Sequence, residues 1–206
     1  MRPADHKIFL ASKSPRRREL LRQIGIEFEL LPLRDQVSRS ADVSEDLLPD
    51  ETAETYVARV SREKADAGLQ IVRWRRLPSR PVLAADTTVV LDNIIFGKPT
   101  DHDEAVKMLS LLSGRTHQVL TSVTVRLEDD SWQLTQSSEV TFATLSQETI
   151  KAYCATTEPY DKAGAYGIQG HAASFIERIN GSYTGIVGLP LFETTQLLRQ
   201  AGVKLP

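Results

Sequence analysis

The chain has 206 residues, of which 41% are hydrophobic and 25% are charged, and its formal net charge is -2. That length allows one substantial core or two small lobes, and that net charge gives no reason to expect a nucleic-acid partner. Cys154 is the only cysteine, which excludes an intrachain disulfide and a cysteine-rich metal site and fits a reducing compartment. No apolar run approaches the roughly 20 residues of a membrane span, and residues 1–6 carry no signal-peptide core, so we expect a cytoplasmic protein without a membrane partner.

The first third of the chain alternates strand-like and helix-like segments. In order, we expect a strand at 8–11, a helix from Pro15 to Gly25, a strand at 28–33, a polar loop at 34–51 and a helix from Ala53 onward. Ser14 followed by Pro15 is typical of a helix N-terminus, where a hydroxyl caps the first turn and proline takes its first position. Helical spacing after Ala53 places Lys64 in line with the apolar face, so that its charge points either to solvent or into a cleft.

The rest of the chain continues this alternation. In order, we expect a strand at 81–92 ending in an Asp92-Asn93 turn, a helix from Asp101 to Gly114, long strands at 119–127 and 132–145, a helix from Ser146, short strands at 174–179 and 185–187, and a last helix from Pro190 to Gly202. Interleaved helices and strands predict an α/β fold with a mixed sheet. The hairpin made by the two long strands argues against a purely parallel sheet.

A cluster of cations and hydroxyls stands where the first strand gives way to the first helix, in Ser12-Lys13-Ser14-Pro15-Arg16-Arg17. A helix N-terminus presents unpaired N–H groups and a partial positive charge, which favour an anion, and arginine suits phosphate because its guanidinium can bind two oxygens. The alternative is a capped helix with a solvated basic first turn. Cations at the N-terminal end of a helix oppose its dipole, so this alternative is electrostatically less favourable.

Asp86 and Lys98 are the next candidate functional residues along the chain. Asp86 lies within an apolar strand, where a carboxylate is costly unless it is paired or bound to metal. It is therefore a candidate general base or metal ligand, and the alternative is a buried Asp bonded to neighbouring backbone. Gly97-Lys98-Pro99 resembles the end of a P-loop without being one, because Asp92 stands where the first glycine would be. Lys98 can still be a phosphate-binding cation.

The segment 158–170 joins Asp161 and Lys162 to three glycines and to Gln169. Glycine lets backbone N–H groups approach a ligand closely, and the Gln169 amide both donates and accepts hydrogen bonds. This pattern suits a small anionic ligand, although an ordinary loop would also carry it. The chain thus offers dispersed carboxylates, Glu45, Asp86 and Asp161, together with the dispersed cations Arg16, Arg17, Lys64, Lys98 and Lys162. Both kinds of group favour polyphosphate chemistry, in which cations neutralise phosphate, carboxylates hold Mg²⁺ and one carboxylate activates water.

Several motifs in fixed order are similar to those of one family. They are Leu10-Ala11-Ser12-Lys13-Ser14-Pro15-Arg16-Arg17, Arg62-Glu63-Lys64-Ala65, Ala84-Ala85-Asp86-Thr87, Gly97-Lys98-Pro99, Ser113-Gly114-Arg115-Thr116-His117, Asp161 to Gly170, Asn180-Gly181-Ser182-Tyr183 and Val187-Gly188-Leu189-Pro190. The chain thereby resembles the Maf family of nucleoside triphosphate pyrophosphatases. The resemblance implies one domain over residues 1–206. It implies an elongated α/β fold, in which a central mixed sheet is flanked by helices and two lobes enclose a deep cleft. This architecture is related to that of inosine triphosphate pyrophosphatases. It also implies cleavage of a nucleoside triphosphate substrate to monophosphate and pyrophosphate with Mg, Mn or Co, and a homodimer.

The resemblance also assigns roles to residues. Asp86 is similar to the family's proton acceptor, and Arg16, Thr87 and Gln169 match the positions that mark the dTTP/UTP subfamily, with modified pyrimidine triphosphates as further substrates. The implied phosphate-binding residues are Ser14, Arg17, Lys64, Lys98 and Lys162. The implied metal ligands are Asp86 and Glu45, with Asp46 as the alternative to Glu45, because the region around residues 38–42 is extended relative to the family.

Two other functions compete with this one. A non-catalytic, nucleotide-binding regulator of cell division and septum formation would need the anion site without a water-activating carboxylate, so Asp86 favours the enzyme. A sibling enzyme for 7-methyl-GTP resembles Ser-Pro-Trp-Arg, Asp-Gln and Ser-Glu-Gly at the three marker positions, none of which this chain carries.

Overall fold

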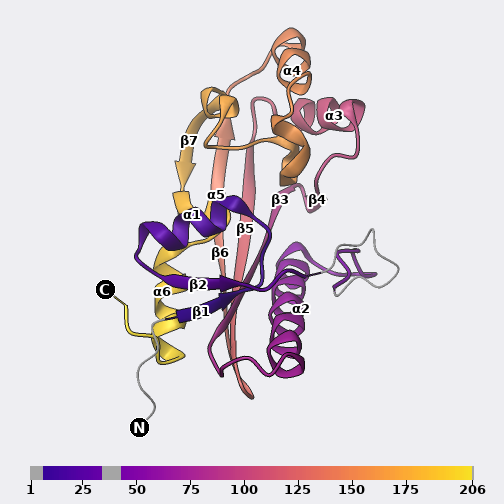
Figure 1. Cartoon of the computed structure of the whole chain (residues 1–206). Helices are drawn as coiled ribbons and strands as arrows, with labels where there is room; N and C mark the ends of the chain where they lie inside the picture. The colour runs from indigo at the N-terminus through magenta and orange to yellow at the C-terminus, as the bar shows by residue number, and fades with distance from the viewer. Residues whose placement is uncertain (1–6, 34–42, 206) are drawn as a thin grey trace.

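The computed structural model describes residues 7–33 and 43–205, which form an elongated α/β molecule (Figure 1). The strands are β1 (Lys7–Leu10), β2 (Glu27–Leu30), β3 (Val82–Leu91), β4 (Ile94–Phe96), β5 (Thr116–Leu127), β6 (Asp130–Phe142) and β7 (Ile176–Asn180). The helices are α1 (Pro15–Gln23), α2 (Ala53–Trp74), α3 (His102–Leu112), α4 (Gln147–Cys154), α5 (Tyr183–Val187) and α6 (Leu191–Gln200). The short 3₁₀ helices are η1 (Glu158–Asp161), η2 (Ala163–Ala165) and η3 (His171–Phe175). No helix within these described ranges is long and apolar enough to cross a membrane.

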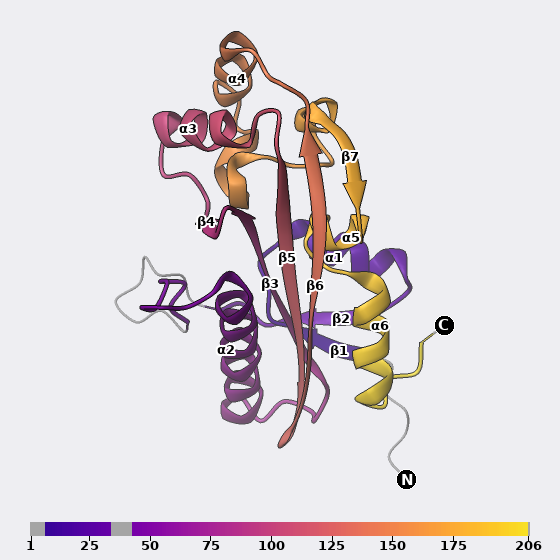
Figure 2. The ribbon, with the colours of Figure 1, turned by 180° about the vertical axis from the view of Figure 1, so that it is seen from behind.

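The strands form one seven-stranded mixed sheet, as the sequence predicts. Its order is β2-β1-β3-β5-β6-β7, with β4 paired to the far end of β3. β1 runs parallel to both β2 and β3, and the pairs from β3 to β7 are antiparallel. The long strands β3, β5 and β6 run along the molecule, with α2 and α6 on opposite sides of them and α3 and α4 at one end (Figures 1 and 2).

The two faces of β3 pack against different partners because successive side chains of a strand point to opposite faces. Val82 and Ala84 pack in an apolar core with α2. On the other face, two apolar cores share the odd-numbered residues: Leu83 and Ala85 lie in one with α1 and α6, and Val89 and Leu91 lie in the other with α3. Thr87 stands between these two cores, directly opposite Thr121 of β5. The apolar face of the sheet is therefore interrupted by hydroxyls at one level.

Most predicted elements are confirmed, and one is wrong. Residues 185–187 form the end of α5 instead of a strand, because the Ser182 side chain accepts a hydrogen bond from the Gly185 N–H and so caps a helix there. The strand expected at 174–179 begins at Ile176, after η3, and β2 ends at Leu30. Residues 43–51 lie in the predicted loop and contain no helix or strand, whereas residues 1–6 and 34–42, including the extension at 38–42, lie outside the described part of the chain.

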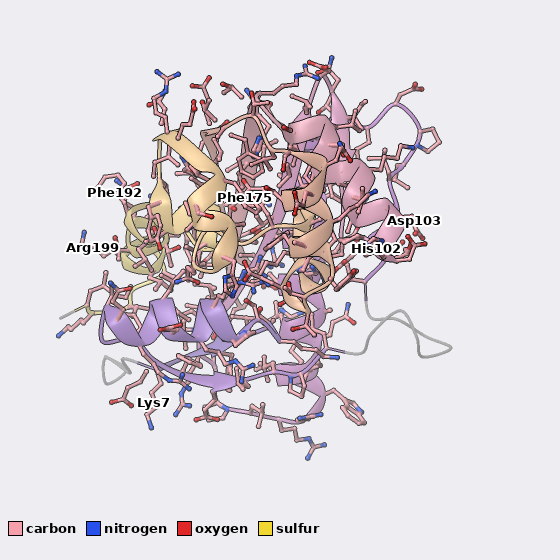
Figure 3. All side chains as sticks on the ribbon, turned by 90° about the horizontal axis from the view of Figure 1, so that it is seen from above. Lys7, His102, Asp103, Phe175, Phe192 and Arg199 are labelled. Atoms are coloured by element: carbon pink, nitrogen blue, oxygen red, sulfur yellow. The ribbon has the colours of Figure 1, made fainter. Side chains whose placement is uncertain are left out.

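The end of the molecule that carries α3 and α4 contains a cluster of aromatic rings around Phe142 and Phe175. Seen along the long axis, Phe175 lies between two margins of the molecule, one carrying Phe192 and Arg199 of α6 and the other carrying His102 and Asp103 of α3 (Figure 3). His117 of β5 belongs to this cluster, with its ring edge-to-face on Phe142. Its Nε2 shares a 2.8 Å hydrogen bond with the Tyr166 hydroxyl, and its Nδ1 has no hydrogen-bond partner among the described residues.

Burial of His117 predicts a specific loss of stability in acid. Burial lowers the pKa of His117 from 6.5 to about 4, so between those pH values the unfolded chain binds a proton that the folded chain does not. The free energy of unfolding therefore falls as pH drops from about 6.5 to 4, by on the order of 3 kcal/mol from this group. Urea unfolding at several pH values should show a flatter pH dependence for His117→Gln, which can still bond to Tyr166. The exposed His102→Gln is the control, and equal slopes for His117→Gln and wild type would contradict the prediction.

Candidate functional site

A cleft of ≈ 800 Å³ opens between the two apolar cores, at the level of Thr87. That volume is within the usual range for a small-molecule site. The cleft is lined by Asp161 and by ten residues to which the family resemblance assigns a role, namely Ser14, Arg16, Arg17, Glu45, Lys64, Asp86, Thr87, Lys98, Lys162 and Gln169. They come from segments far apart in the chain, and the fold brings them to one place. Their individual roles remain proposals.

The N-terminus of α1 forms one wall of the cleft. The Ser14 side chain accepts a hydrogen bond from the Arg17 N–H and caps the helix, as its sequence predicts. The Arg17 guanidinium is fixed by three bonds, to the Gly188 carbonyl at 2.7 Å, to Thr87 Oγ1 at 3.2 Å and to Ser12 Oγ at 3.4 Å. A cation held in this way is oriented before any ligand arrives, so little entropy is lost when it binds an anion.

Lys64 of α2 joins the two carboxylates expected to bind metal. Its Nζ lies 2.7 Å from Asp86 Oδ1 and 2.6 Å from Glu45 Oε1. Asp86 lies on the face of β3 toward α2, because it follows Val82 and Ala84 at a spacing of two residues. Asp86 is only 9% exposed, and the ammonium compensates for the burial of its charge.

Glu45 is placed by contacts between its loop and α2. The Tyr56 hydroxyl donates to the Glu45 carbonyl at 3.0 Å, and Arg59 Nη2 donates to the Asp46 carbonyl at 2.9 Å. Burial alone would raise the pKa of Glu45, but the nearby Lys64 brings that pKa below its ordinary value. The Asp46 carboxylate instead accepts a bond from Ser44 Oγ, and Asp46 does not line the cleft. Glu45 is therefore the better placed of the two alternatives.

The glycine-rich segment forms the opposite wall and is held together by charged groups. Lys162 Nζ donates to the Glu158 carbonyl at 2.6 Å and pairs with the carboxylate of Asp161, which also binds Arg16 Nη1 at 3.1 Å. The Glu158 carboxylate accepts bonds from the backbone N–H of His171 at 3.0 Å and from the Tyr153 hydroxyl, also at 3.0 Å. Burial alone would raise the pKa of Glu158, but these bonds lower it.

The charge of the cleft suits a polyphosphate. Among the residues that the structure describes, six cationic and four anionic side chains line it. The cations come from the α1 N-terminus, α2, the turn after β4 and the glycine-rich segment, so they can meet several phosphate groups along a chain. The described part of the chain has no group of three His, Cys, Asp or Glu side chains that could hold a metal. Glu45 and Asp86, whose carboxylates converge on Lys64, remain the proposed metal ligands.

Three residues that contribute to the cleft were missed by sequence reasoning. Tyr56 positions the loop of Glu45, Glu158 ties the two ends of the glycine-rich segment together, and Thr121 supports Thr87 from the neighbouring strand. Thr121 carries a usable signal, because Val119 and Val123 flank it on the same face and make it a polar break in an apolar stripe. Tyr56 and Glu158 carry no comparable signal, since the contacts that make them important here are to backbone groups 11 and 13 residues away, which no sequence pattern marks.

The family model and the similar sequences point to one family. A family model described as "Maf-like protein" matches residues 7–201. A dTTP/UTP pyrophosphatase of Aromatoleum aromaticum is 54% identical over 206 residues, with all of both chains covered. A dTTP/UTP pyrophosphatase of Nitrosomonas europaea is 51% identical, with 98% of each chain covered. Among solved structures, the Ham1 protein of Staphylococcus aureus matches with a TM-score of 0.44 and 16% identity over 66% of this chain and 72% of that one.

Proposed function

The chain belongs to the Maf family, and we propose that it is a nucleoside triphosphate pyrophosphatase that hydrolyses dTTP and UTP to the monophosphate and pyrophosphate. The observation that carries the proposal is the convergence in one cleft of a buried carboxylate, Asp86, with cations from four separate segments. The relatives named dTTP/UTP pyrophosphatase, at about half identity over their full length, support the same function. A non-catalytic regulator of cell division would not need a carboxylate that activates water, so Asp86 favours the enzyme.

The proposed chemistry follows from the charges in the cleft. Asp86 accepts a proton from a water molecule, whose oxygen then bonds to the α-phosphorus. The bond from the α-phosphorus to the bridging oxygen breaks, and pyrophosphate leaves with that oxygen. Arg17, Lys98 and Lys162 are the proposed cations that hold the triphosphate and stabilise the charge that develops on it.

A divalent cation is part of the proposal, with Glu45 and Asp86 as the residues that would hold it. Both carboxylates already converge on one positive charge, the ammonium of Lys64. Carboxylate oxygens are also the ligands that Mg²⁺ and Mn²⁺ prefer, and Mg²⁺ commonly uses one or two carboxylates together with substrate phosphates. A bound Mg²⁺, Mn²⁺ or Co²⁺ would supply neutralisation of phosphate charge. The donor set therefore fits the group.

The products of UTP hydrolysis test the proposed function. With purified protein, UTP and Mg²⁺, we expect UMP and pyrophosphate in equal amounts and poor turnover of UDP. Separation of the nucleotides by ion-exchange chromatography, with an assay that distinguishes pyrophosphate from orthophosphate, measures both products. Accumulation of UDP with orthophosphate would place the cleavage at the wrong bond, and no hydrolysis at all would favour a binding protein.

Gln169 is the proposed reader of the pyrimidine base. Uracil and thymine present O2, N3–H and O4, so an amide can donate from its NH₂ group to a carbonyl of the base and accept from N3–H. Gln169 is an exposed residue that lines the cleft. Gln169→Glu replaces its NH₂ donor by a second acceptor, so a carbonyl of the bound base loses its partner, at a cost of about 1–3 kcal/mol. We expect kcat/KM for UTP to fall roughly ten- to hundred-fold, with the melting temperature near that of wild type. Full activity on UTP would remove Gln169 from base recognition.

A further inference from the structure

The floor of the cleft carries a hydrogen-bonded pair of threonines, Thr87 and Thr121. Thr87 matches a position that marks the dTTP/UTP subfamily, whereas Thr121 has no role in the chemistry described above. Their Oγ1 atoms lie 3.0 Å apart on neighbouring strands. Thr121 is fully buried, whereas Thr87 is the one half-buried residue of β3 and lines the cleft. Thr121 also lies 2.8 Å from the carbonyl oxygen of Gly185.

The two ends of this chain of hydrogen bonds, Arg17 and the Gly185 carbonyl, fix the direction of every bond in it. A carbonyl oxygen cannot donate, so Thr121 donates its single hydroxyl proton to the Gly185 carbonyl. With that proton used, Thr121 can only accept from Thr87. At the other end, Arg17 Nη2 donates to Thr87 Oγ1 at 3.2 Å, and an arginine has no acceptor. The protons therefore run one way, from Arg17 through Thr87 and Thr121 to the Gly185 carbonyl.

This direction decides what Thr87 offers to a ligand. The only proton of Thr87 points down to Thr121, away from the cleft, and the hydroxyl oxygen keeps one accepting position beside the one that Arg17 uses. Arg17 cannot turn to change this arrangement, because it is also bound to the Gly188 carbonyl at 2.7 Å. Thr87 is therefore an acceptor toward the cleft, and a ligand group placed against it must donate.

We propose that Thr121 is a positioning residue for base selection, which makes Thr87 an acceptor for the N3–H of uracil and thymine. Cytosine has an unprotonated N3, an acceptor that would face the Thr87 oxygen without a proton between them. Gln169 then acts chiefly through its NH₂ group, on a neighbouring carbonyl of the base. The inference rests on the proposed hydrolysis of dTTP and UTP and adds to it a residue that never touches the nucleotide.

Thr121→Val tests the inference, because valine has nearly the shape of threonine and neither donates nor accepts. Without Thr121 as its acceptor, Thr87 can turn its proton to the cleft. We expect the ratio of kcat/KM for UTP to that for CTP to fall roughly ten-fold or more. The change should appear as a higher KM for UTP and a lower KM for CTP, with kcat for UTP close to wild type. Thr121→Ser restores the hydroxyl and should restore the ratio.

Thr124→Val is the matched control, since Thr124 is equally buried, lies three residues farther along β5 and does not line the cleft. Its hydroxyl is bonded to Ser61 Oγ at 2.9 Å and to Gln133 Nε2 at 2.9 Å, so the same substitution also breaks a buried network. We expect Thr124→Val to lower the melting temperature as Thr121→Val does and to leave the UTP-to-CTP ratio unchanged.

Two outcomes overturn the inference. An unchanged ratio in folded Thr121→Val, with a loss of stability like that of the control, makes Thr121 a structural residue only. An equal fall for UTP and CTP means that Thr87 meets a donor on the sugar, which both nucleotides share. If Thr121→Val does not fold, two other measurements decide the question. Thr121→Ser should keep the UTP-to-CTP ratio of wild type, and Thr121→Ala should lose the preference of wild type for binding non-hydrolysable α,β-imido UTP over the CTP analogue. Wild type that releases no pyrophosphate from UTP overturns the proposed function itself, which separates the two failures.

Discussion

Asp86→Asn should lower kcat for UTP about 10²–10⁴-fold, the usual effect of losing a general base. The amide has the shape of the carboxylate but cannot take a proton from water. Folding should change little, because Lys64 keeps Glu45 as a partner at 2.6 Å after the substitution. Pyrophosphate release under saturating UTP measures the effect, and thermal unfolding shows that the variant is folded.

Asp161→Asn is the control for Asp86, since it removes a second carboxylate from the same cleft. Asp161 is more exposed and is already engaged by Arg16 and Lys162. An exposed pair contributes little, so we expect a loss of roughly five-fold at most. Near-normal turnover in Asp86→Asn together with a large loss in Asp161→Asn would move the proton acceptor to Asp161.

Gly170→Ala should be strongly destabilising, although it adds only a methyl group. A Cβ at position 170 would overlap the carboxylate of Glu158. That carboxylate cannot easily move, because it binds the N–H of His171 and the hydroxyl of Tyr153. Overpacking together with the strained bonds should cost about 3 kcal/mol of the free energy of unfolding, or about 6–12 °C in melting temperature for a chain of this length.

A double-mutant cycle identifies the cause of that loss. Glu158→Ala removes the carboxylate that the new methyl group would meet, so Gly170→Ala should cost much less in the Glu158→Ala background than in wild type. Gly97→Ala is the control in the same cleft, because a Cβ there would have no atom within 4 Å. Additive effects of the two substitutions would show that the glycine is needed for another reason.

Local signals in the sequence predicted most of the fold. Ser14 and Pro15 mark the start of α1, and the Asp92-Asn93 turn connects β3 to β4, with positive φ at both residues. The interpretation of residues 185–187 as a strand was wrong because three apolar residues fit a strand and a short helix equally well. The serine three positions before Gly185 was the better signal, since it caps α5.

The motifs also predicted which residues line the cleft, but not how they are held there. Asp86 and Thr87 are neighbours in sequence and face opposite sides of β3, so one meets Lys64 and the other meets Arg17. Thr121 can be recognised in the sequence as a polar break in the apolar stripe of its strand, but only the register of β5 shows that it stands opposite Thr87. Such contacts depend on tertiary pairing, for which local sequence carries little information.

The specificity constants of wild type for UTP, dTTP, CTP and GTP test the central claim most directly. They should be measured as pyrophosphate release with Mg²⁺, Mn²⁺ and Co²⁺ in turn, each in excess over nucleotide. We expect UTP and dTTP to exceed CTP and GTP roughly ten- to hundred-fold, the discrimination given by one unpaired buried polar group. Equal specificity constants for UTP and CTP would contradict a cleft that selects the uracil and thymine edge.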